Sequence, residues 1–367
     1  MMNREESNPF LFDGIPTAIV CDILSRLPTK TSINCKLVCK EWCRIIVSPE
    51  FAELRRACDS YFSLLFFGKF CSSGANFVLL DLDKNSYVNE NCNLSVSVDA
   101  MIRFKCEFTY PKWKLHLVNE CNGLICLKTL EIWGPYIICN PLTGQFVIVK
   151  QSPKPFHFLL GYGLGCCPVT HQFKVLRILM TKFKYVAEIQ TLGTDEWRTI
   201  DDAQTCNGKI GAFLHGSLHW YTPEDHSIWS FQLGNEKFVR VPVPEHTKGS
   251  RATEVTVFDS HLCFSCISND SCQRDIWLMK EYGMKESWVK QFVMKKGEYG
   301  LLYVPLLRFG SGKILVSFRG RCNLLVYDLQ SETYKQVKVH GVPSFELVAC
   351  DMKLSALYSC IQCSTEN

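Results

Sequence analysis

A repeated unit constrains the fold of this chain more than any other feature of its sequence. Each copy joins an apolar run to a turn cluster and then to an aromatic residue that opens a second β-rich run. The aromatic residues are Phe146, Trp197, Phe238, Trp288 and Tyr334, and successive ones lie 41–51 residues apart. Regular spacing of this length indicates an array of similar structural units.

A second hairpin lies between successive copies, with glycine at its turn in the segments 122–126, 215–220 and 310–315. Two hairpins per repeat supply four strands, which is the content of one β-propeller blade. We therefore predict an all-β propeller of six blades, with seven as the alternative number. The run from Phe77 to Tyr87 is expected to be a degenerate first copy. An irregular β-sandwich is the structural alternative.

Composition indicates a folded protein and bears on the kinds of partner that it can bind. The chain has 367 residues, of which 47% are hydrophobic and 21% charged, so it can build a large core. Its net charge of +4 gives no general reason to expect nucleic acid or an anionic membrane as a partner. No apolar run approaches the ~18 residues of a membrane-spanning helix, and residues 1–8 lack the apolar core of a secretory signal. We expect the protein in the cytoplasm, the nucleus or both.

The chain contains 21 cysteines, many of them inside apolar runs. An odd number cannot pair completely, and a chain of this length is not the small secreted type that disulfides stabilise. Two Cys-x-x-Cys pairs, Cys263/Cys266 and Cys360/Cys363, lie too far apart for a zinc site built from two pairs. Residues three apart on a strand also point to opposite faces. We predict buried thiols, with no structural disulfide, metal or other cofactor.

Residues 15–56 have a different periodicity, because their apolar side chains follow helical spacing. Five aliphatic residues from Ile19 to Leu27 fall on one face of a helix, which Pro28 ends. The helical spacing resumes at Ile33 and continues to Ile46. A few short helices have little core of their own, so we expect a partner to cover part of their apolar surface. Ile45 and Ile46 are expected in the core of the helices themselves.

This helical segment resembles the F-box. The match is carried by Ile15-Pro16, Leu27-Pro28, Val38-Cys39-Lys40-Glu41-Trp42, Pro49 and Phe51, together with the aliphatic residues between them. Ile15 stands where the family usually has leucine, and the change keeps an aliphatic group of similar volume. The remaining chain resembles the F-box-associated domain of plant F-box proteins, through the segments 121–126, 140–144, 192–198, 216–220 and 275–283.

The two resemblances imply a multi-domain chain in which a small all-α F-box precedes the all-β propeller. The expected division is a disordered N-terminus at 1–11, the F-box at 12–56, the propeller at 57–361 and a C-terminal tail at 362–367. By the same resemblance, the adaptor-binding residues are expected to be Ile15, Pro16, Ile19, Val20, Ile23, Leu24, Leu27, Pro28, Ile33, Val38, Cys39, Lys40 and Trp42.

In that family the F-box binds a Skp-type adaptor, which joins it to a cullin scaffold and a RING subunit, and the C-terminal domain holds the protein to be ubiquitinated. The resemblance therefore implies a non-catalytic substrate receptor of an SCF-type (Skp–cullin–F-box) ubiquitin ligase. Two other classes stay open: an F-box scaffold that does not lead to degradation, and a propeller enzyme or sugar-binding protein. The identity of the substrate cannot be read from propeller loops. Segments 151–157, 201–209 and 244–253 are expected to be the recognition loops.

Three other motifs are interpreted as structural features without a catalytic or ligand-binding role. The glycines of 161–165 lack the spacing and the following helix of a phosphate loop, so we interpret them as strand and turn glycines. His215, His219 and His226 accompany no nucleophile motif, and we predict no catalytic residue among them. Three lysines between residues 290 and 296 are interpreted as a solvated strand edge.

Overall fold

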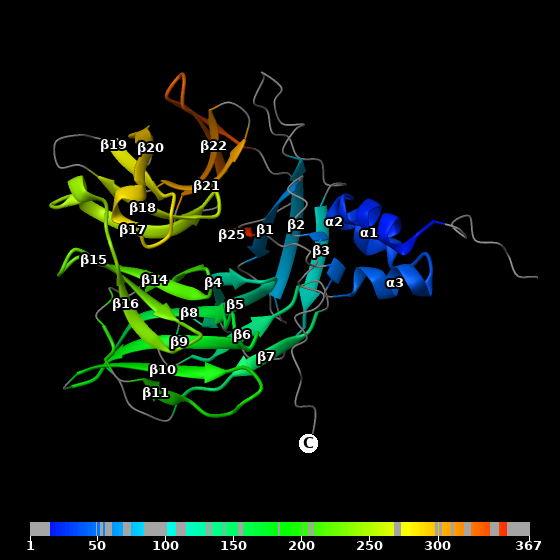
Figure 1. The fold of residues 1–367 in the computed structure, drawn as a ribbon, viewed down its shortest axis with the longest axis horizontal. Coiled ribbons are helices and arrows are strands. Elements are labelled where there is room, and N and C mark those ends of the chain that lie inside the picture. The colour runs from blue at the N-terminus through cyan, green and yellow to red at the C-terminus, as the bar shows by residue number, and fades with distance from the viewer. Residues whose placement is uncertain are drawn as a thin grey trace, which may run out of the picture.

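The computed structural model of the chain is shown in Figure 1. It describes residues 15–48, 50–51, 54–55, 61–68, 75–83, 101–107, 115–129, 131, 134–141, 144–152, 157–182, 184–200, 202–204, 206, 209–267, 273–297, 300, 303–309, 312–318, 324–337 and 345–350.

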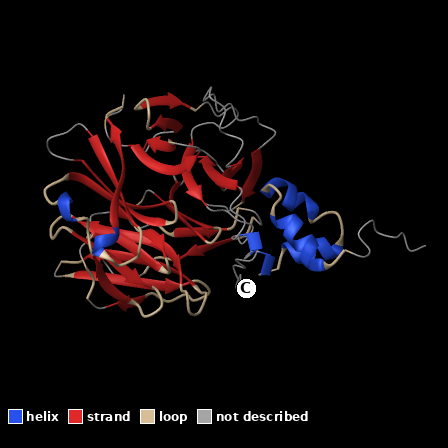
Figure 2. Ribbon diagram, turned by 45° about the horizontal axis from the view of Figure 1, so that its top comes forward, coloured by secondary structure: helices blue, strands red, loops and turns tan. Residues whose placement is uncertain are grey.

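Short helices form the first described part of the chain, at one side of a larger body of strands (Figures 1 and 2). They are α1 (Thr17–Ser25), α2 (Thr29–Cys35) and α3 (Lys40–Ile46), and residues 50–51 and 54–55 are also helical. Pro16 and Pro28 directly precede α1 and α2. Cys39 caps α3, because its Sγ accepts a hydrogen bond from the backbone N–H of Trp42 at 3.4 Å.

The described strands form six sheets, each a meander of antiparallel neighbours. In spatial order, the first three blades are β25 (Phe345–Cys350), β1 (Tyr61–Gly68), β2 (Ala75–Asp83) and β3 (Met101–Cys106); β4 (Leu115–Cys121), β5 (Leu124–Thr129), β6 (Tyr136–Cys139) and β7 (Phe146–Val149); and β12 (Lys209–Ile210), β8 (Phe158–Cys166), β9 (Phe173–Met180), β10 (Tyr185–Thr191) and β11 (Arg198–Ile200). The short β12 is the exception to the meander, since it pairs with β8 in parallel.

The other three sheets each contain four strands. They are β13 (Ala212–Leu214), β14 (Ser217–Thr222), β15 (Ser227–Gln232) and β16 (Lys237–Val241); β17 (Arg251–Phe258), β18 (His261–Ile267), β19 (Gln273–Met279) and β20 (Trp288–Lys295); and β21 (Tyr303–Phe309), β22 (Lys313–Phe318), β23 (Leu324–Asp328) and β24 (Thr333–Gln336). Two 3₁₀ turns, η2 (Glu245–Thr247) and η3 (Lys285–Ser287), lie between strands.

The sheets are arranged as the six blades of a propeller. The strands β25, β4, β8, β13, β17 and β21 contact one another in a closed ring. Each is the innermost strand of its blade, except that the two-residue β12 lies at the inner edge of β8. The circle is closed within the first blade, where β25 from the end of the chain pairs with β1. Six blades are therefore confirmed, and the seven-bladed and β-sandwich alternatives are wrong. Apolar clusters of described residues fill the spaces between successive blades from the first to the sixth, and in this way the sheets bury the faces that they turn to each other.

The repeat identified in the sequence corresponds to the outer half of each blade. In blades 2 to 6 the apolar run is the third strand, and the aromatic residue lies within one residue of the start of the outermost strand. In the first blade the run from Phe77 forms β2, but the outermost strand β3 begins at Met101. Tyr87, the expected closing aromatic of that copy, lies outside the described residues.

Strand direction assigns the loops to two faces of the propeller. Because the strands alternate in direction, the turns within the first and third strand pairs of every blade share one face, called here the hairpin face. The turns between second and third strands, and the connections between blades, share the opposite face, called the crossover face. The end of β25 lies beside the start of β1, since Cys350 pairs with Ser63. The chain therefore enters the propeller from the helices on the hairpin face.

Candidate functional site

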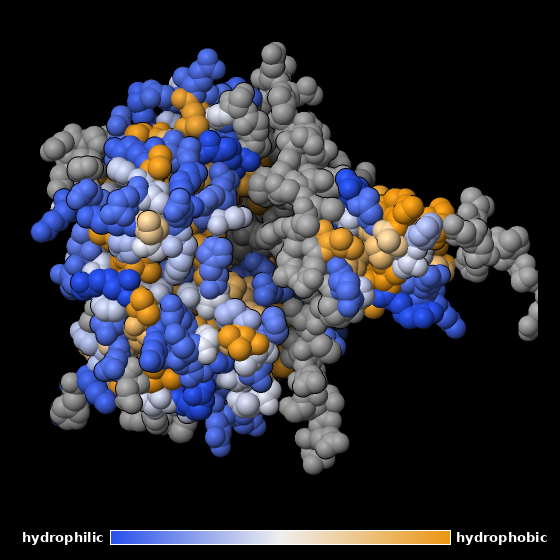
Figure 3. Space-filling model, viewed as in Figure 1, coloured by the Kyte–Doolittle hydropathy of each residue, from blue (hydrophilic) through white to orange (hydrophobic). Residues whose placement is uncertain are grey.

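The helices expose an unusual number of large aliphatic side chains. Ile15, Ile19, Ile23, Leu37 and Val38 are exposed, and Leu37 keeps 87% of its surface accessible. Ile19 and Ile23 are four residues apart on α1, so they lie on one face of that helix. Figure 3 shows apolar side chains gathered over this part of the molecule. We call these five residues the exposed aliphatic set; an apolar surface of this kind is typical of a protein-binding site.

The predicted adaptor-binding residues separate into three groups by burial. Val20 and Leu24 lie in the core between the helices, together with Ile45, Ile46 and Phe51. Leu27, Pro28, Ile33, Cys39 and Trp42 are half-buried, whereas Ile15, Pro16, Ile19, Ile23, Val38 and Lys40 are exposed. Placement of Ile45 and Ile46 in the helical core is confirmed. Leu37 was missed as a candidate, because helical spacing alone does not show that it follows the last turn of α2.

A buried arginine holds the helices together. Arg55 donates hydrogen bonds to the backbone oxygen of Ser25 at 2.6 Å, to the backbone oxygen of Leu27, and to Oγ1 of Thr29 at 3.2 Å. The backbone oxygens of Ser25 and Leu27 lie at the end of α1, where carbonyls lack helical partners, and Thr29 is the first residue of α2. Arg55 thereby fixes the angle between the helix that carries Ile19 and Ile23 and the helix that precedes Leu37.

A surface ion pair borders the aliphatic residues of α1. Asp22 and Arg26 are four residues apart on the helix, and Arg26 Nη2 lies 2.9 Å from Asp22 Oδ1. The hydrogen bond from Arg26 lowers the pKa of Asp22 below its ordinary value. Apolar side chains with a charged border are the usual composition of a protein–protein interface.

The glycines of 161–165 are strand glycines, as predicted, and they allow blade 4 to approach closely. All three lie in β8. A Cβ added at Gly165 would lie 2.3 Å from Leu233 Cδ1, and one at Gly161 would lie 2.3 Å from Cys206 Sγ. These glycines therefore serve packing between blades, since any side chain would displace atoms of the neighbouring blade.

The three histidines lie on a strand and in turns, as predicted. His219 is fully buried on β14, where its Nδ1 lies 3.0 Å from the backbone oxygen of Ala212 and its Nε2 lies 2.7 Å from the hydroxyl of Tyr282. Burial lowers the pKa of His219 to about 4. His226 contacts the Tyr221 hydroxyl through Nδ1 at 2.8 Å. These contacts are structural, because both ring nitrogens of His219 already have protein partners.

Nine of the thirteen described cysteines are buried, as predicted, whereas Cys21, Cys35, Cys39 and Cys43 in the helices are half-buried. All thirteen cysteines among the described residues are free thiols. Cys263 and Cys266 lie on β18 in two different inter-blade clusters, so they face opposite sides of the sheet. Cys360 and Cys363 lie outside the described residues. The lysine run lies on the outermost strand β20, but Lys290 forms an ion pair with Asp275 at 2.6 Å instead of only facing solvent.

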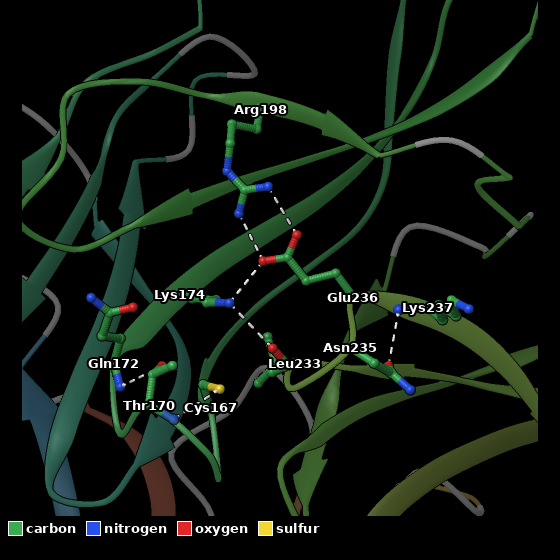
Figure 4. A network of polar contacts seen from close by, with 9 residues as sticks. All are labelled: Cys167, Thr170, Gln172, Lys174, Arg198, Leu233, Asn235, Glu236 and Lys237. Atoms are coloured by element: carbon green, nitrogen blue, oxygen red, sulfur yellow. Dashed lines mark hydrogen bonds and ion pairs between the residues drawn. The ribbon is translucent and has the colours of Figure 1, made fainter.

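A charged network joins blades 3 and 4, as Figure 4 shows. Lys174 Nζ donates to Glu236 Oε1 at 2.7 Å and to the backbone oxygen of Leu233 at 3.2 Å. Arg198 donates to both carboxylate oxygens of Glu236, at 2.7 and 2.9 Å. The hydrogen bonds from Arg198 and Lys174 lower the pKa of Glu236 to about 2. The network is a structural contact between blades, with each cation already paired.

Each predicted recognition loop follows an outermost strand and precedes the first strand of the next segment, so the described ends of the three loops lie on the crossover face. The third of them is shorter than expected, because residues 245–247 form η2 and the strand β17 begins at Arg251. Within the loops, Ser152 is buried and donates to Glu188 Oε1 at 3.1 Å, and Cys206 is buried between blades.

The described residues lack two features, a cluster of metal ligands and a membrane-spanning helix. No group of three or more His, Cys, Asp or Glu side chains in this part of the chain could hold a metal ion. Among the described helices, none is long and apolar enough to cross a membrane.

Comparisons with known proteins give separate family matches to the helical part of the chain and to the propeller. The family described as F-box domain matches residues 12–54, and the family described as F-box associated beta propeller domain matches residues 70–361. The F-box protein CPR1 of Arabidopsis thaliana is 25% identical, over 90% of this chain and 86% of its own length. The F-box protein DOR of the same plant is also 25% identical, over 95% of this chain and 92% of its own.

A further relative, the F-box protein At3g07870 of Arabidopsis thaliana, is 23% identical over 91% of this chain and 89% of its own length. Among solved structures, a chain of a nidogen/laminin complex covers 78% of this chain and 98% of its own, with a TM-score of 0.46 and 11% identity. That likeness is too distant to assign a function. The helical match and the propeller match together show that the chain is a plant F-box protein with a C-terminal F-box-associated β-propeller domain.

Proposed function

We propose that this protein is the substrate-recognition subunit of an SCF-type E3 ubiquitin ligase. In this proposal the F-box, residues 12–56, is an all-α domain that binds a Skp-type adaptor and through it a cullin scaffold. The propeller, residues 57–361, binds an unidentified target protein. The chain itself is not an enzyme in this complex, and it binds neither nucleic acid nor membrane.

The exposed aliphatic set is the observation that carries the proposal. The core between the helices holds Val20 and Leu24 but leaves Ile19, Ile23 and Leu37 in water. Exposed aliphatic side chains have a free-energy cost that a partner groove removes, at about 25 cal/mol for each Å² covered. Aliphatic anchors spaced along a helix are also the usual way in which a helix binds a groove.

The two faces of the propeller support separate sites for the adaptor and for the target protein. The chain joins the helices to the hairpin face, whereas the connections between blades lie on the crossover face. An adaptor bound at the helices would therefore leave the crossover loops accessible to a target. Loops on a rigid scaffold are the usual place for recognition.

Adaptor binding by purified full-length protein tests the first half of the proposal. The double variant Ile19→Asp with Leu37→Asp places two carboxylates in the exposed aliphatic set without entering the core. We expect its affinity for the Skp-type adaptor to fall by at least about 30-fold, since losing one buried anchor costs ~2 kcal/mol. The matched control is Val169→Asp, which changes an aliphatic residue of 75% exposure on the propeller. Equal binding by the double variant and the control would refute the adaptor surface.

The change Pro16→Ala with Trp42→Ala, which the sequence alone suggests, is less direct. Trp42 is half-buried against the core of the helices, so its truncation also weakens the fold.

Overexpression of residues 1–56 tests the second half of the proposal, in which the propeller binds the target. This fragment should bind the adaptor, recruit no target and compete with the intact protein, so the level of the target should rise. Adaptor binding with no change in target level, for fragment and intact protein alike, would instead support the scaffold that does not lead to degradation. Ubiquitination of the target by the fragment would contradict the assignment of recognition to the propeller.

A further inference from the structure

A groove opens on the crossover face of blade 3. It has a volume of about 600 Å³ and lies where β10 begins and β11 ends. Its lining includes Lys184, Tyr185, Val186, Ile200, Asp202 and Ala203. Ile200 and Ala203 also pack against the apolar cluster between blades 3 and 4, so the floor of the groove is held by the core.

A row of apolar side chains extends this groove along the same face. Met180 on β9 pairs in register with Phe158 on β8 and with Tyr185 on β10. Directly opposed residues on adjacent strands project to the same face of a sheet, so these three side chains form one row. Phe158 keeps 57% of its surface exposed and Tyr185 keeps 42%. Two exposed aromatic rings beside a groove are suitable anchors for an apolar side chain of a partner.

At the groove, no described strand pairs with the first residues of β10 on the side away from β9. β11 pairs with β10 only from Ala187 to Ile189. Tyr185 and Val186 therefore form the outer edge of the described sheet at this point. An extended peptide can add backbone hydrogen bonds along such an edge, while its side chains enter neighbouring pockets.

Charge distinguishes this region from the rest of the protein. The whole chain is nearly balanced, yet no Asp or Glu occurs between Glu131 and Glu188, a stretch that contains six Lys or Arg residues. Two of these six, Lys182 and Lys184, are exposed in the turn between β9 and β10, and Lys184 lines the groove. Lys184 forms no ion pair with the described residues. Asp202 is the one acidic residue in the described lining of the groove.

We propose that this groove binds an extended acidic segment of the target protein, with an apolar side chain on the Phe158–Tyr185 row and carboxylates beside Lys182 and Lys184. The proposal rests on the proposed function, because it assumes that the propeller holds the target. It adds the blade, the face and the chemistry of the recognised segment. Electrostatic complementarity of this kind selects partners and speeds their association, and it weakens as salt is added.

Peptide binding to the full-length protein in complex with its adaptor tests the proposal. The probe is a short fluorescein-labelled peptide of acidic residues around a single phenylalanine, followed by fluorescence polarisation. One comparison peptide has lysines in place of the acids, and a second has serine in place of the phenylalanine. We expect each comparison peptide to bind at least about tenfold more weakly, and binding of the acidic peptide to weaken as salt rises. Equal binding of all three peptides, or no binding of the acidic one, would overturn the proposal.

Variants of the protein then locate the binding site. The double variant Lys182→Glu with Lys184→Glu should lose at least about tenfold in affinity for the acidic peptide, and Tyr185→Ser should weaken it independently of salt. The matched controls are Lys280→Glu, an exposed lysine on blade 5, and Val169→Ser, an exposed aliphatic residue on the hairpin face. Equal losses in variants and controls would place peptide binding elsewhere and refute the groove.

Adaptor affinity, measured on the same samples, separates this proposal from the proposed function. Retained adaptor binding with unchanged peptide binding in the groove variants would refute the groove alone. Absence of adaptor binding by the unaltered protein would refute the proposed function, whatever the peptide results. Thermal unfolding of each variant verifies that the exposed substitutions leave the fold intact.

Discussion

His219 of blade 4 accepts a hydrogen bond from the hydroxyl of Tyr282 in blade 5, across 2.7 Å. The direction of this hydrogen bond follows from the partner of the other ring nitrogen, Nδ1. Nδ1 faces the backbone oxygen of Ala212, which can only accept, so Nδ1 carries the proton and Nε2 of the neutral ring is an acceptor. Tyr282 lies in the turn between β19 and β20, and this bond therefore ties the hairpin of one blade to the second strand of the next.

Stability should decrease in mild acid because of this histidine. Burial lowers the pKa of His219 in the folded protein to about 4, below its unfolded value of about 6.5. The unfolded chain therefore takes up the proton first, and the free energy of unfolding falls as the pH drops from about 6.5 to about 4. The loss should reach about 3 kcal/mol. Urea unfolding at several pH values measures it.

His219→Gln and Tyr282→Phe serve as the comparison for that experiment. Glutamine does not titrate, so its variant should have a shallower pH dependence than the unaltered protein. Tyr282→Phe keeps the buried histidine and should retain most of the dependence. The same slope in the His219→Gln variant and in the unaltered protein would assign the acid sensitivity to other groups.

Glu236 should matter more to stability than the arginine that faces it. Its removal in Glu236→Gln leaves the ammonium of Lys174 buried without its carboxylate, which should cost about 3 kcal/mol. Arg198 is 54% exposed, so Arg198→Ala should cost less than about 1 kcal/mol. Chemical denaturation of both variants gives the ranking, and the reverse order would contradict it.

Acid should also weaken the same network, at a lower pH than His219. The folded pKa of Glu236 is held near 2, mainly by Arg198, and the unfolded value is about 4.5. The contribution of Glu236 is complete above about pH 4.5 and is lost as the pH falls toward 2. Glu236→Gln should therefore lose this part of the acid transition, as followed by circular dichroism.

Gly165→Ala should destabilise the propeller. The added methyl group would lie 2.3 Å from Leu233 and 3.1 Å from the Phe213 ring, so blade 4 must move. Overpacking of this kind typically costs about 1–3 kcal/mol. Gly68→Ala is the control, because it is also a strand glycine but the nearest described atoms, those of Asn76, would be 3.7 Å away. Equal melting temperatures for the two variants would argue against close packing at Gly165.

Arg55→Met should loosen the helices and leave the propeller unchanged. Methionine fills much of the same volume but donates no hydrogen bonds to Ser25, Leu27 and Thr29. Each charge-assisted bond contributes roughly 1.5–3 kcal/mol, and methionine replaces none of them. Hydrogen exchange should accelerate in α1 and α2 but not in the strands of the blades. Uniform acceleration, or none, would contradict the local role of Arg55.

The sequence by itself determined the class of fold and the position of its two parts. A repeat of four strands cannot bury both faces of its sheet alone, so regular copies ending at Phe146, Trp197, Phe238, Trp288 and Tyr334 require stacking around an axis. Helical spacing before residue 56 likewise identified Ile45 and Ile46 as core. Both inferences depend on residues close in the chain, whose relative positions follow from local geometry.

Only the tertiary structure decided the number of blades, the exposed part of the helices and the partners of the buried charges. The ring closes because β25, beyond the last recognisable repeat, pairs with β1. Leu37 is exposed and Leu24 buried because of how three short helices pack together. Gly165 meets Leu233, and Lys174 meets Glu236, only after blades 3 and 4 are side by side. Contacts between residues far apart in sequence depend on that assembly, and no local pattern encodes them.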